Sequence, residues 1–360
     1  PQVIENGNLD PTAGIIETLS LTDGLVSQQL ALKKYHRSLL ESGEYWRQSM
    51  TRFNAQNRVD ATLISNLRIM RRTLINQISK RCDKSKEIIT GVVHALLSRS
   101  IFIKYLEERK DSNGETVFPQ DFYCNFMESA KWYTDVLNSK EATYNLFLTL
   151  KDKFNGDTLQ VSEIETEIIT QDDLDELRTF ILGNSELESR QLTLWPLYSF
   201  DIIPIQLISS IYELFFHLSD EEDEKGTYYT PLHLVNLVMD EVYPWEGEYK
   251  DISFFDPSCG SGIFLVEAYR RLVCRWMSQN AVQAITCDRL NLLLKNSIFG
   301  VDINEEAIRV ASFSLSLAMC DFLDPRSIWD KLSFPSLLGK NLISSDFFDE
   351  DKSFNKERYD

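Results

Sequence analysis

The sequence predicts an α + α/β fold, in which a mainly helical N-terminal domain is followed by part of an α/β domain. Through much of residues 26–110, apolar residues recur every three or four positions, which is the period of a buried helix face. Near residue 255 a short apolar strand leads through a glycine turn into a helix, and near residue 300 a second strand ends in an acid. Strands that alternate with helices are typical of α/β domains.

Three segments follow from this division. Residues 1–25 are polar and lack a periodic pattern, so we expect a linker or the tail of an upstream domain. Residues 26–220 predict the helical N-terminal domain, and residues 221–360 predict the first half of the α/β domain. The boundary is placed at the acidic run 219–225, which has the composition of a solvated linker. Because the chain begins with Pro1 rather than methionine, we expect a piece of a longer protein.

The helical elements are expected from their apolar stripes. Residues 63–78 carry apolar side chains at three- and four-residue spacing, and residues 95–106 and 204–217 predict two further buried helices. Residues 115–200 alternate helical stretches with loops, one of them at 154–157. The first stripe consists of Leu63, Leu67, Met70, Leu74 and Ile78.

The α/β elements begin with a helix that Thr230 caps and Pro231 opens, a position where the missing N–H of proline costs nothing. Later elements are a helix at 263–272, a helical insertion at about 275–295, and a strand at 296–302, after which Asn304 caps another helix. The residues expected to form the buried face of the first helix are Leu234, Leu237, Val238 and Val242.

The totals argue against several classes of protein. No apolar stretch approaches the roughly 20 residues that span a bilayer, and the N-terminus lacks the charged and apolar regions of an export signal. We therefore expect a cytoplasmic protein with no membrane partner. The six cysteines form no Cys-x-x-Cys pair and the four histidines are scattered, so the sequence predicts reduced thiols and no metal site.

Positive charge is concentrated in one segment of an acidic chain. The net charge is −18, but residues 31–110 hold 17 Lys/Arg and 7 Asp/Glu, a local net charge of +10. Two interpretations remain open, a solvated helix face or a surface that contacts DNA phosphates, because affinity for phosphate depends on local charge. The candidate DNA-binding residues are Arg68, Arg71, Arg72, Lys80, Arg81, Lys84 and Lys86.

The glycine turn at residues 256–262 indicates ligand binding. Gly260 and Gly262 permit positive φ and let a ligand approach the backbone, and the turn aims helix N–H groups above the strand end. The turn lacks the third glycine of the dinucleotide fingerprint and the Gly-Lys-Ser/Thr of a triphosphate site. A ligand loop and a plain tight turn both remain open. We expect Cys259 to be a small turn residue rather than a nucleophile.

Four segments together resemble the S-adenosylmethionine-dependent DNA methyltransferases that modify adenine at N6. Residues 256–265, Asp-Pro-Ser-Cys-Gly-Ser-Gly-Ile-Phe-Leu, resemble the family's first cofactor motif, and residues 226–231, Gly-Thr-Tyr-Tyr-Thr-Pro, resemble the segment before it. Residues 300–304, Gly-Val-Asp-Ile-Asn, resemble the second motif, and residues 341–348 resemble the third more loosely. The segments occur in the family's order. Upstream, residues 99–109, 154–157 and 198–216 resemble the helical region of Type IIG restriction-modification enzymes and Type I modification subunits.

The resemblance implies a Rossmann-like domain that binds S-adenosylmethionine. Its methionyl end would lie near Tyr229, Thr230 and Pro231, and Asp256 would accept from its ammonium group. Asp302 would accept from both ribose hydroxyls. The expected cofactor-binding residues are Tyr229, Thr230, Pro231, Asp256, Pro257, Ser258, Cys259, Gly260, Gly262, Phe264, Asp302, Ile303, Asp346 and Phe347.

Three of these residues are expected at the adenine of the cofactor. Ile303 would pack on the ring, Asp346 would accept from the amino group, and Phe347 would stack beside it. Asp302 lies 46 residues after Asp256, farther than the roughly 20 residues of the dinucleotide fingerprint, and the predicted helical insertion accounts for the difference.

The family's Asn/Asp-Pro-Pro-Tyr/Phe catalytic motif does not occur in this sequence, so we predict no catalytic residue in it. In the family a short strand and then this motif follow the third cofactor motif, and we expect them beyond Asp360. The 360 residues are therefore expected to bind the cofactor without methylating DNA. In the intact enzyme the methyl group would pass to N6 of a flipped-out adenine in double-stranded DNA. A specificity or restriction subunit is a further expected partner.

Two other functions remain open. One is an RNA or protein methyltransferase with the same core, although the basic helical region before Tyr229 fits the DNA enzymes better. The other is a non-enzymatic module that uses the fold to contact DNA or a partner subunit. Cofactor titration separates this non-enzymatic module from the DNA methyltransferase and from the RNA or protein methyltransferase.

Overall fold

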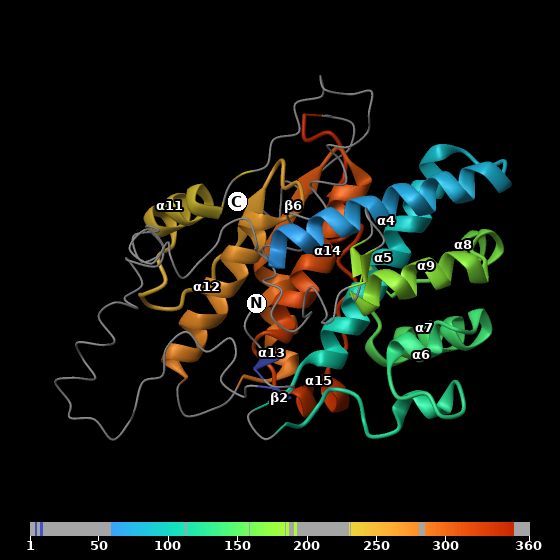
Figure 1. Ribbon diagram of the computed structural model, residues 1–360. Coiled ribbons are helices and arrows are strands. Elements are labelled where there is room, and N and C mark those ends of the chain that lie inside the picture. The colour runs from blue at the N-terminus through green and yellow to red at the C-terminus, as the bar shows by residue number, and fades with distance from the viewer. Residues whose placement is uncertain are drawn as a thin grey trace. The chain divides into compact units, whose positions relative to one another are not determined.

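The computed structural model describes residues 4–5, 8–9, 59–111, 114–157, 159–183, 185–186, 191–192, 230, 232–280 and 285–348. The chain divides into two compact units, Pro1–Arg58 and Val59–Asp360. In the first unit the described residues form a short antiparallel pair, β1 (Ile4–Glu5) and β2 (Asn8–Leu9). The second unit holds every other described element (Figure 1).

Two long helices begin the second unit. Helix α4 (Val59–Arg81) packs along α5 (Lys86–Glu108), which starts where the Ser85 hydroxyl accepts a hydrogen bond from the backbone of Ile88. The stripe predicted on α4 is confirmed, because all five of its apolar side chains are buried.

Helix α5 corrects the expectation that no segment is apolar enough to span a membrane. By length and composition alone α5 would qualify, but 72% of its apolar window is buried within the protein. Burial of this kind is expected of a core helix, because packed neighbours on all sides favour an apolar surface all round.

A group of shorter helices packs against this pair. Helix α9 contacts both α4 and α5, and it ends at Gly183 in the left-handed conformation. A two-residue antiparallel pair follows, β3 (Ser185–Glu186) and β4 (Gln191–Leu192). The helices between α5 and this pair are the 3-10 helix η2 (Phe122–Asn125), α6 (Tyr133–Val136), α7 (Lys140–Phe154), α8 (Glu163–Ile168) and α9 (Gln171–Leu182).

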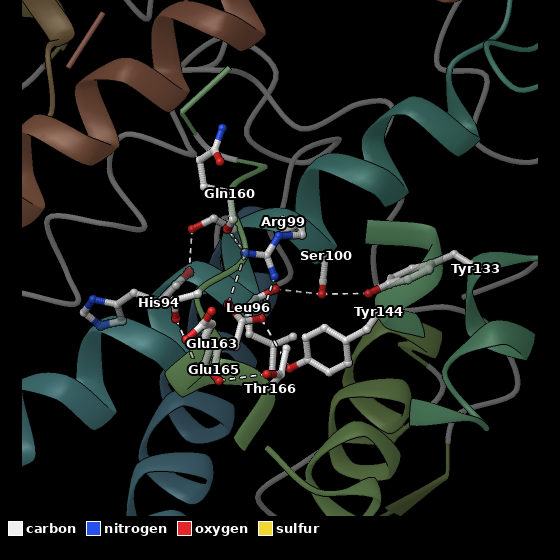
Figure 2. Close-up of polar contacts among 12 residues, drawn as sticks. His94, Leu96, Arg99, Ser100, Tyr133, Tyr144, Gln160, Glu163, Glu165 and Thr166 are labelled. Carbon is white, nitrogen blue, oxygen red and sulfur yellow. Dashed lines mark hydrogen bonds and ion pairs between the residues drawn. The ribbon is translucent and has the colours of Figure 1, made fainter. Parts of the chain in front are cut away.

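A buried ion pair holds α5 against the start of α8 (Figure 2). The Arg99 guanidinium donates to both carboxylate oxygens of Glu165, at 2.7 and 3.2 Å, and to the Gln160 carbonyl at 2.5 Å. Arg99 also lies 4.7 Å from the ring centre of Phe147, and the Tyr144 hydroxyl donates to Glu165. Because burying an unpaired charge is costly, this pairing is what allows two ions inside the helical region.

The α/β part contains a three-stranded parallel sheet in the order β5-β6-β7. Residues Phe254–Asp256 form β5, Ile298–Asp302 form β6, and Leu342–Ser344 form β7. In the observed register Asp256 pairs with Gly300, and Asp302 pairs with Ser344. The surrounding helices are α11 (Leu232–Val242), α12 (Ile263–Gln279), α13 (Cys287–Ser297), α14 (Glu305–Cys320) and α15 (Pro325–Lys331).

Helices α12 and α14 pack on each other and on the sheet, α12 against β5 and β6 and α14 against β6 and β7. Most described residues of the predicted insertion at about 275–295 are helical, because residues 275–279 end α12 and residues 287–295 belong to α13. Helix α13 leads directly into β6, so the second strand begins without an intervening loop.

The predicted buried face of α11 is wrong. Leu234, Leu237, Val238 and Val242 are 43–69% exposed, whereas Val235 and Met239 are buried. The two buried residues are four positions apart and lie on the same face of α11, which packs on α12. Both faces of α11 are apolar, so the periodicity does not indicate which one faces inward.

The helical elements and the α/β elements share one core. The Phe102 ring on α5 lies 6.1 Å from Phe313 on α14 and 5.6 Å from Phe334. Arg109, just after α5, donates to the carbonyl of Cys320 at 2.8 Å. The domain boundary expected at 219–225 and the helix expected at 204–217 lie outside the described residues.

Candidate cofactor-binding site

The carboxyl ends of the three strands meet at one edge of the parallel sheet. Strands β5 and β6 each end in an acid, Asp256 and Asp302, and β7 ends at Ser344, shortly before Asp346. Ligands bind at this edge in open α/β sheets. The structure therefore brings the two acids expected from the sequence to neighbouring strand ends.

The glycine turn closes over the end of β6. The Cys259 backbone N–H donates to the Val301 carbonyl at 2.9 Å, and the Gly260 N–H donates to Asp302 Oδ2 at 2.9 Å. Gly262, with φ of +80°, is the N-cap of α12. A Cβ at Gly262 would lie 2.9 Å from the Cβ of Ala311 on α14, so only glycine allows α12 and α14 this close.

Sequence reasoning missed a second glycine that the site needs. Gly300 lies in the middle of β6, and a Cβ there would lie 2.7 Å from Leu265 Cδ1 and 2.9 Å from Cys259 Sγ. An isolated glycine inside a strand pattern is a known sign of close packing. In the sequence Gly300 begins the Gly-Val-Asp-Ile-Asn segment, and its place inside a strand pattern is the signal for this close packing.

Asp302 anchors two backbone amides and still has acceptor capacity. Its Oδ1 accepts from the Asn304 N–H at 2.8 Å and its Oδ2 from Gly260. A carboxylate offers about four acceptor positions, so each oxygen has capacity for a further hydrogen bond. The half-buried Asp302 carboxylate can therefore accept from a pair of neighbouring hydroxyls, such as those of a ribose.

The surroundings of Asp256 disfavour the charged form of its carboxyl group. Burial raises the pKa of its carboxyl, the N–H of Ser258 lowers this pKa, and the nearby charge of Asp302 raises it again. The Ser258 N–H donates to Asp256 Oδ1 at 3.1 Å. A cation beside Asp256 would offset both the lost solvation and the repulsion, so the geometry fits an ammonium group.

Apolar side chains are exposed beside these acids. Ile303, directly after Asp302, is 75% exposed, and Phe347 and Phe348 are 40% and 85% exposed. The Phe347 ring lies 5.7 Å from that of Phe255 and 5.3 Å from that of Phe348. Exposed apolar groups gathered next to polar groups are typical of ligand sites, and these can hold a flat ring. Phe348 was not among the expected residues.

The remaining expected cofactor residues are only partly placed. Pro257 and Ser258 are exposed in the turn, and Phe264 is half-buried at the start of α12. Thr230 is half-buried just before α11, whereas Tyr229 and Pro231 lie outside the described residues. Asp346 is exposed, and its Oδ1 accepts from the Phe348 N–H at 2.9 Å.

Cys259 is buried within the turn. Burial raises the pKa of its thiol, and the charges of Asp256 and Asp302 raise this pKa further. The thiol is therefore protonated at neutral pH, and a protonated thiol is a poor nucleophile. In the part of the chain that the structure describes, no cluster of three or more His, Cys, Asp or Glu could hold a metal ion.

Three of the seven candidate DNA-binding residues on α4, at the start of α5 and between them contact other side chains of the protein. Arg81 pairs with the buried carboxylate of Asp173 on α9, and Arg71 Nε donates to His94 Nε2 at 2.9 Å. Lys84 lies 3.9 Å from Glu167. These contacts give Arg71 and Arg81 partners inside the protein. Those of the seven that are exposed are Arg72, Lys80, Arg81, Lys84 and Lys86, and Arg68 and Arg71 are half-buried.

Comparison with known proteins identifies similar sequences. Residues 204–328 match the family model of the N-6 DNA Methylase. The adenine-specific methyltransferase PglX of Streptomyces coelicolor is 40% identical over 70 residues, 19% of this chain and 6% of the relative. The adenine-specific methyltransferase BrxX of Escherichia coli O9:H4 is 32% identical over 120 residues, 28% of this chain and 10% of the relative. The matches thus span a tenth or less of these curated relatives.

A solved structure of the Type IIL restriction-modification enzyme MmeI in complex with DNA is 15% identical, with a TM-score of 0.43. That match covers 79% of this chain and 40% of the MmeI chain. The family-model match includes both strand-end acids and the glycine turn between them. Residues 204–328 are thus similar to the N-6 DNA Methylase family, and shorter stretches of the chain are similar to two adenine-specific methyltransferases.

Proposed function

We propose that this chain is the S-adenosylmethionine-binding part of a DNA adenine-N6 methyltransferase from a restriction-modification or phage-defence system. The observation that carries the proposal is the pair of acids at neighbouring strand ends, with the glycine turn bonded to one of them. The family-model match and this arrangement support a Rossmann-like methyltransferase domain around the three described strands.

The residues at the sheet edge suit the parts of this cofactor. Asp302 has acceptor capacity for the two ribose hydroxyls, and Asp256 carries a charge that a bound ammonium would stabilise. Ile303 and Phe347 offer apolar surface for the adenine ring. S-adenosylmethionine supplies an activated methyl group when bound, and the role of these side chains is to fix its orientation.

In the intact enzyme we propose methyl transfer to N6 of an adenine flipped out of double-stranded DNA. Transfer needs acceptors that polarise the amino group and an aromatic surface for the base. The Asn/Asp-Pro-Pro-Tyr/Phe motif that supplies them in the family is not among these 360 residues. We therefore expect the 360 residues to bind cofactor without methylating DNA.

Calorimetric titration with S-adenosylmethionine and S-adenosylhomocysteine tests the proposal. We expect saturable binding to the wild-type chain and weaker binding to Ile303→Ser, which removes exposed apolar surface and should fold normally because the side chain is 75% exposed. Leu292→Ser, at a 45% exposed position on α13, is the matched control and should bind as the wild type does. Folded wild-type protein that gives no heat with either ligand would instead favour a non-enzymatic binding module.

A further inference from the structure

One carboxylate of the helical region is bonded to the α/β region by four hydrogen bonds. Asp157 follows α7, and its Oδ2 accepts from the Ser312 hydroxyl on α14 at 2.9 Å and from the N–H groups of Leu337 and Leu338 at 2.9 and 3.2 Å. Its Oδ1 accepts from the Ser336 hydroxyl at 3.0 Å. The donors lie 155 to 181 residues farther along the chain.

The loop that carries Asp157 is shaped to reach these donors. Asn155 and Gly156 have φ of +56° and +85°, and a Cβ at Gly156 would lie 2.9 Å from the Cβ of Phe334. The Phe334 N–H donates to the Phe154 carbonyl at 2.7 Å, and the two rings pack 6.1 Å apart. Each residue of the Phe-Asn-Gly-Asp stretch thus contributes to holding the segment that precedes β7.

The segment held by Asp157 leads directly into the candidate site. The Leu337 carbonyl accepts from the N–H groups of Lys340, Asn341 and Leu342, at 2.9–3.1 Å, so the turn before β7 is built on the residue that Asp157 binds. The turn continues into β7, and two of the three expected adenine contacts, Asp346 and Phe347, lie just after that strand.

Two backbone hydrogen bonds then tie this segment to β6. Asn341 accepts from the Gly300 N–H at 2.8 Å, and Ser345 donates to the Asp302 carbonyl at 2.9 Å. Ser312, the fourth donor to Asp157, lies on α14, which begins three residues after Asp302. Asp157 therefore binds both α14, the helix that follows β6, and the segment that leads into β7, the strand beside β6.

We propose that Asp157 is a positioning residue for the cofactor site, which sets β7 and the following Asp346 and Phe347 against Asp302. This inference rests on the proposed function of the site. It gives the helical region a part in cofactor binding. An asparagine has the same shape as aspartate but only one acceptor oxygen, and its amide group would face donors. Asp157→Asn should therefore disturb the site without creating a cavity.

The test uses the full chain carrying Asp157→Asn. The control is Asp152→Asn, which removes the same charge from an exposed position on α7. Calorimetric titration with S-adenosylhomocysteine should show an affinity loss of about tenfold or more for Asp157→Asn, as expected when several hydrogen bonds to a charged group are lost. Asp152→Asn should match the wild type. Ser336→Ala is a second variant for use if Asp157→Asn folds poorly, because it removes only one donor to Asp157, at an exposed position. It should lower the affinity for S-adenosylhomocysteine by about threefold.

Amide hydrogen exchange separates positioning from general destabilisation. In Asp157→Asn we expect faster exchange at Leu337, Leu342 and Ser345, while the amides of α4 and α5 exchange at the wild-type rate. A folded variant with wild-type affinity and wild-type exchange at these residues overturns the inference, and so does uniformly faster exchange across the chain. Absence of binding to the wild type would refute the proposed function instead, and the exchange measurement would still decide whether Asp157 positions β7.

Discussion

The glycine turn at 256–262 and the Phe154–Asp157 loop are held in the same way, but their partners lie at different separations along the sequence. In each, one glycine with positive φ, Gly262 or Gly156, lets the backbone pack closely, and a carboxylate accepts from backbone N–H groups. The turn at 256–262 bonds within the α/β region, to β6. The loop at 154–157 bonds to a segment about 180 residues later. The comparison teaches that the candidate site is held by contacts within the α/β region and by contacts from the helical region.

The largest expected effect comes from adding a Cβ to the closely packed glycine of each loop. Gly262→Ala and Gly156→Ala each place a Cβ 2.9 Å from another Cβ at φ of +80° and +85°. We expect each to lower the free energy of unfolding by about 3 kcal/mol, from backbone strain and overpacking together. The measurement is the urea midpoint of unfolding.

Gly114→Ala is the matched control for these two changes. Its φ is +81° and no atom lies within 4 Å of the added Cβ, so it isolates the backbone strain, about 1 kcal/mol. Equal losses at all three positions would mean that close packing contributes nothing and would remove the likeness between the two loops.

The next effect concerns cofactor affinity. Asp302→Ala removes the acceptor for both expected ribose hydroxyls and for the N–H of Gly260, so we expect S-adenosylhomocysteine affinity to fall by about 100-fold. Asp330→Asn, on α15, is the control for loss of an exposed acid and should leave affinity unchanged. Both are read by calorimetry, and a decrease under threefold for Asp302→Ala would show that the turn is structural only.

A smaller effect is expected at a contact between α5 and α14. The Nδ1 of His94 lies 3.5 Å from Glu306, and its Nε2 accepts from Arg71. Burial lowers the pKa of His94, Glu306 raises this pKa, and the charge of Arg71 lowers it. The folded state therefore binds fewer protons than the unfolded state. Stability that is present at pH 8 should decline as the pH falls through the ordinary His pKa of 6.5.

His94→Gln keeps a hydrogen-bonding group but does not titrate in this range. Urea midpoints measured from pH 8 to pH 5 should decline less for His94→Gln than for the wild type. Parallel curves for the two proteins would mean that His94 is not the titrating group.

The smallest expected effect is a gain in stability at the site itself. Burial and Asp302 raise the pKa of Asp256 above its ordinary value of 3.8, so the folded protein holds this proton more tightly than the unfolded chain. The ionised carboxylate thus lowers stability at neutral pH. Asp256→Asn should raise the melting temperature slightly at pH 7, with the difference shrinking as the pH falls toward 3.8, and should also weaken S-adenosylmethionine binding. A lower melting temperature at pH 7 would contradict this account of the acid.

Much of the local structure could be predicted from the sequence, because it depends on neighbouring residues. The buried stripe of α4 follows from spacing, and Asn304 caps α14 as expected, accepting from the N–H of Glu306 at 3.0 Å. The adjacent acids at the ends of β5 and β6 follow from two strands with the same pattern.

What could not be predicted depends on distant partners. The acids that engage the basic residues of α4 come much later in the chain, as Asp173 does for Arg81. On α11 apolar residues occur on both faces, and only packing on α12 selects Val235 and Met239. The donors to Asp157 are likewise set by tertiary structure, so a four-residue pattern carried no sign of them.

The separation between Asp157 and Leu338 also constrains how the protein is made. A ribosome must add 181 residues after Asp157 before its last donor exists, which takes roughly 9 to 36 seconds at about 5 to 20 residues per second. During that interval the rings of Phe102 and Phe154 lack their later neighbour Phe334. Slower translation therefore lengthens the time for which these two rings lack that neighbour.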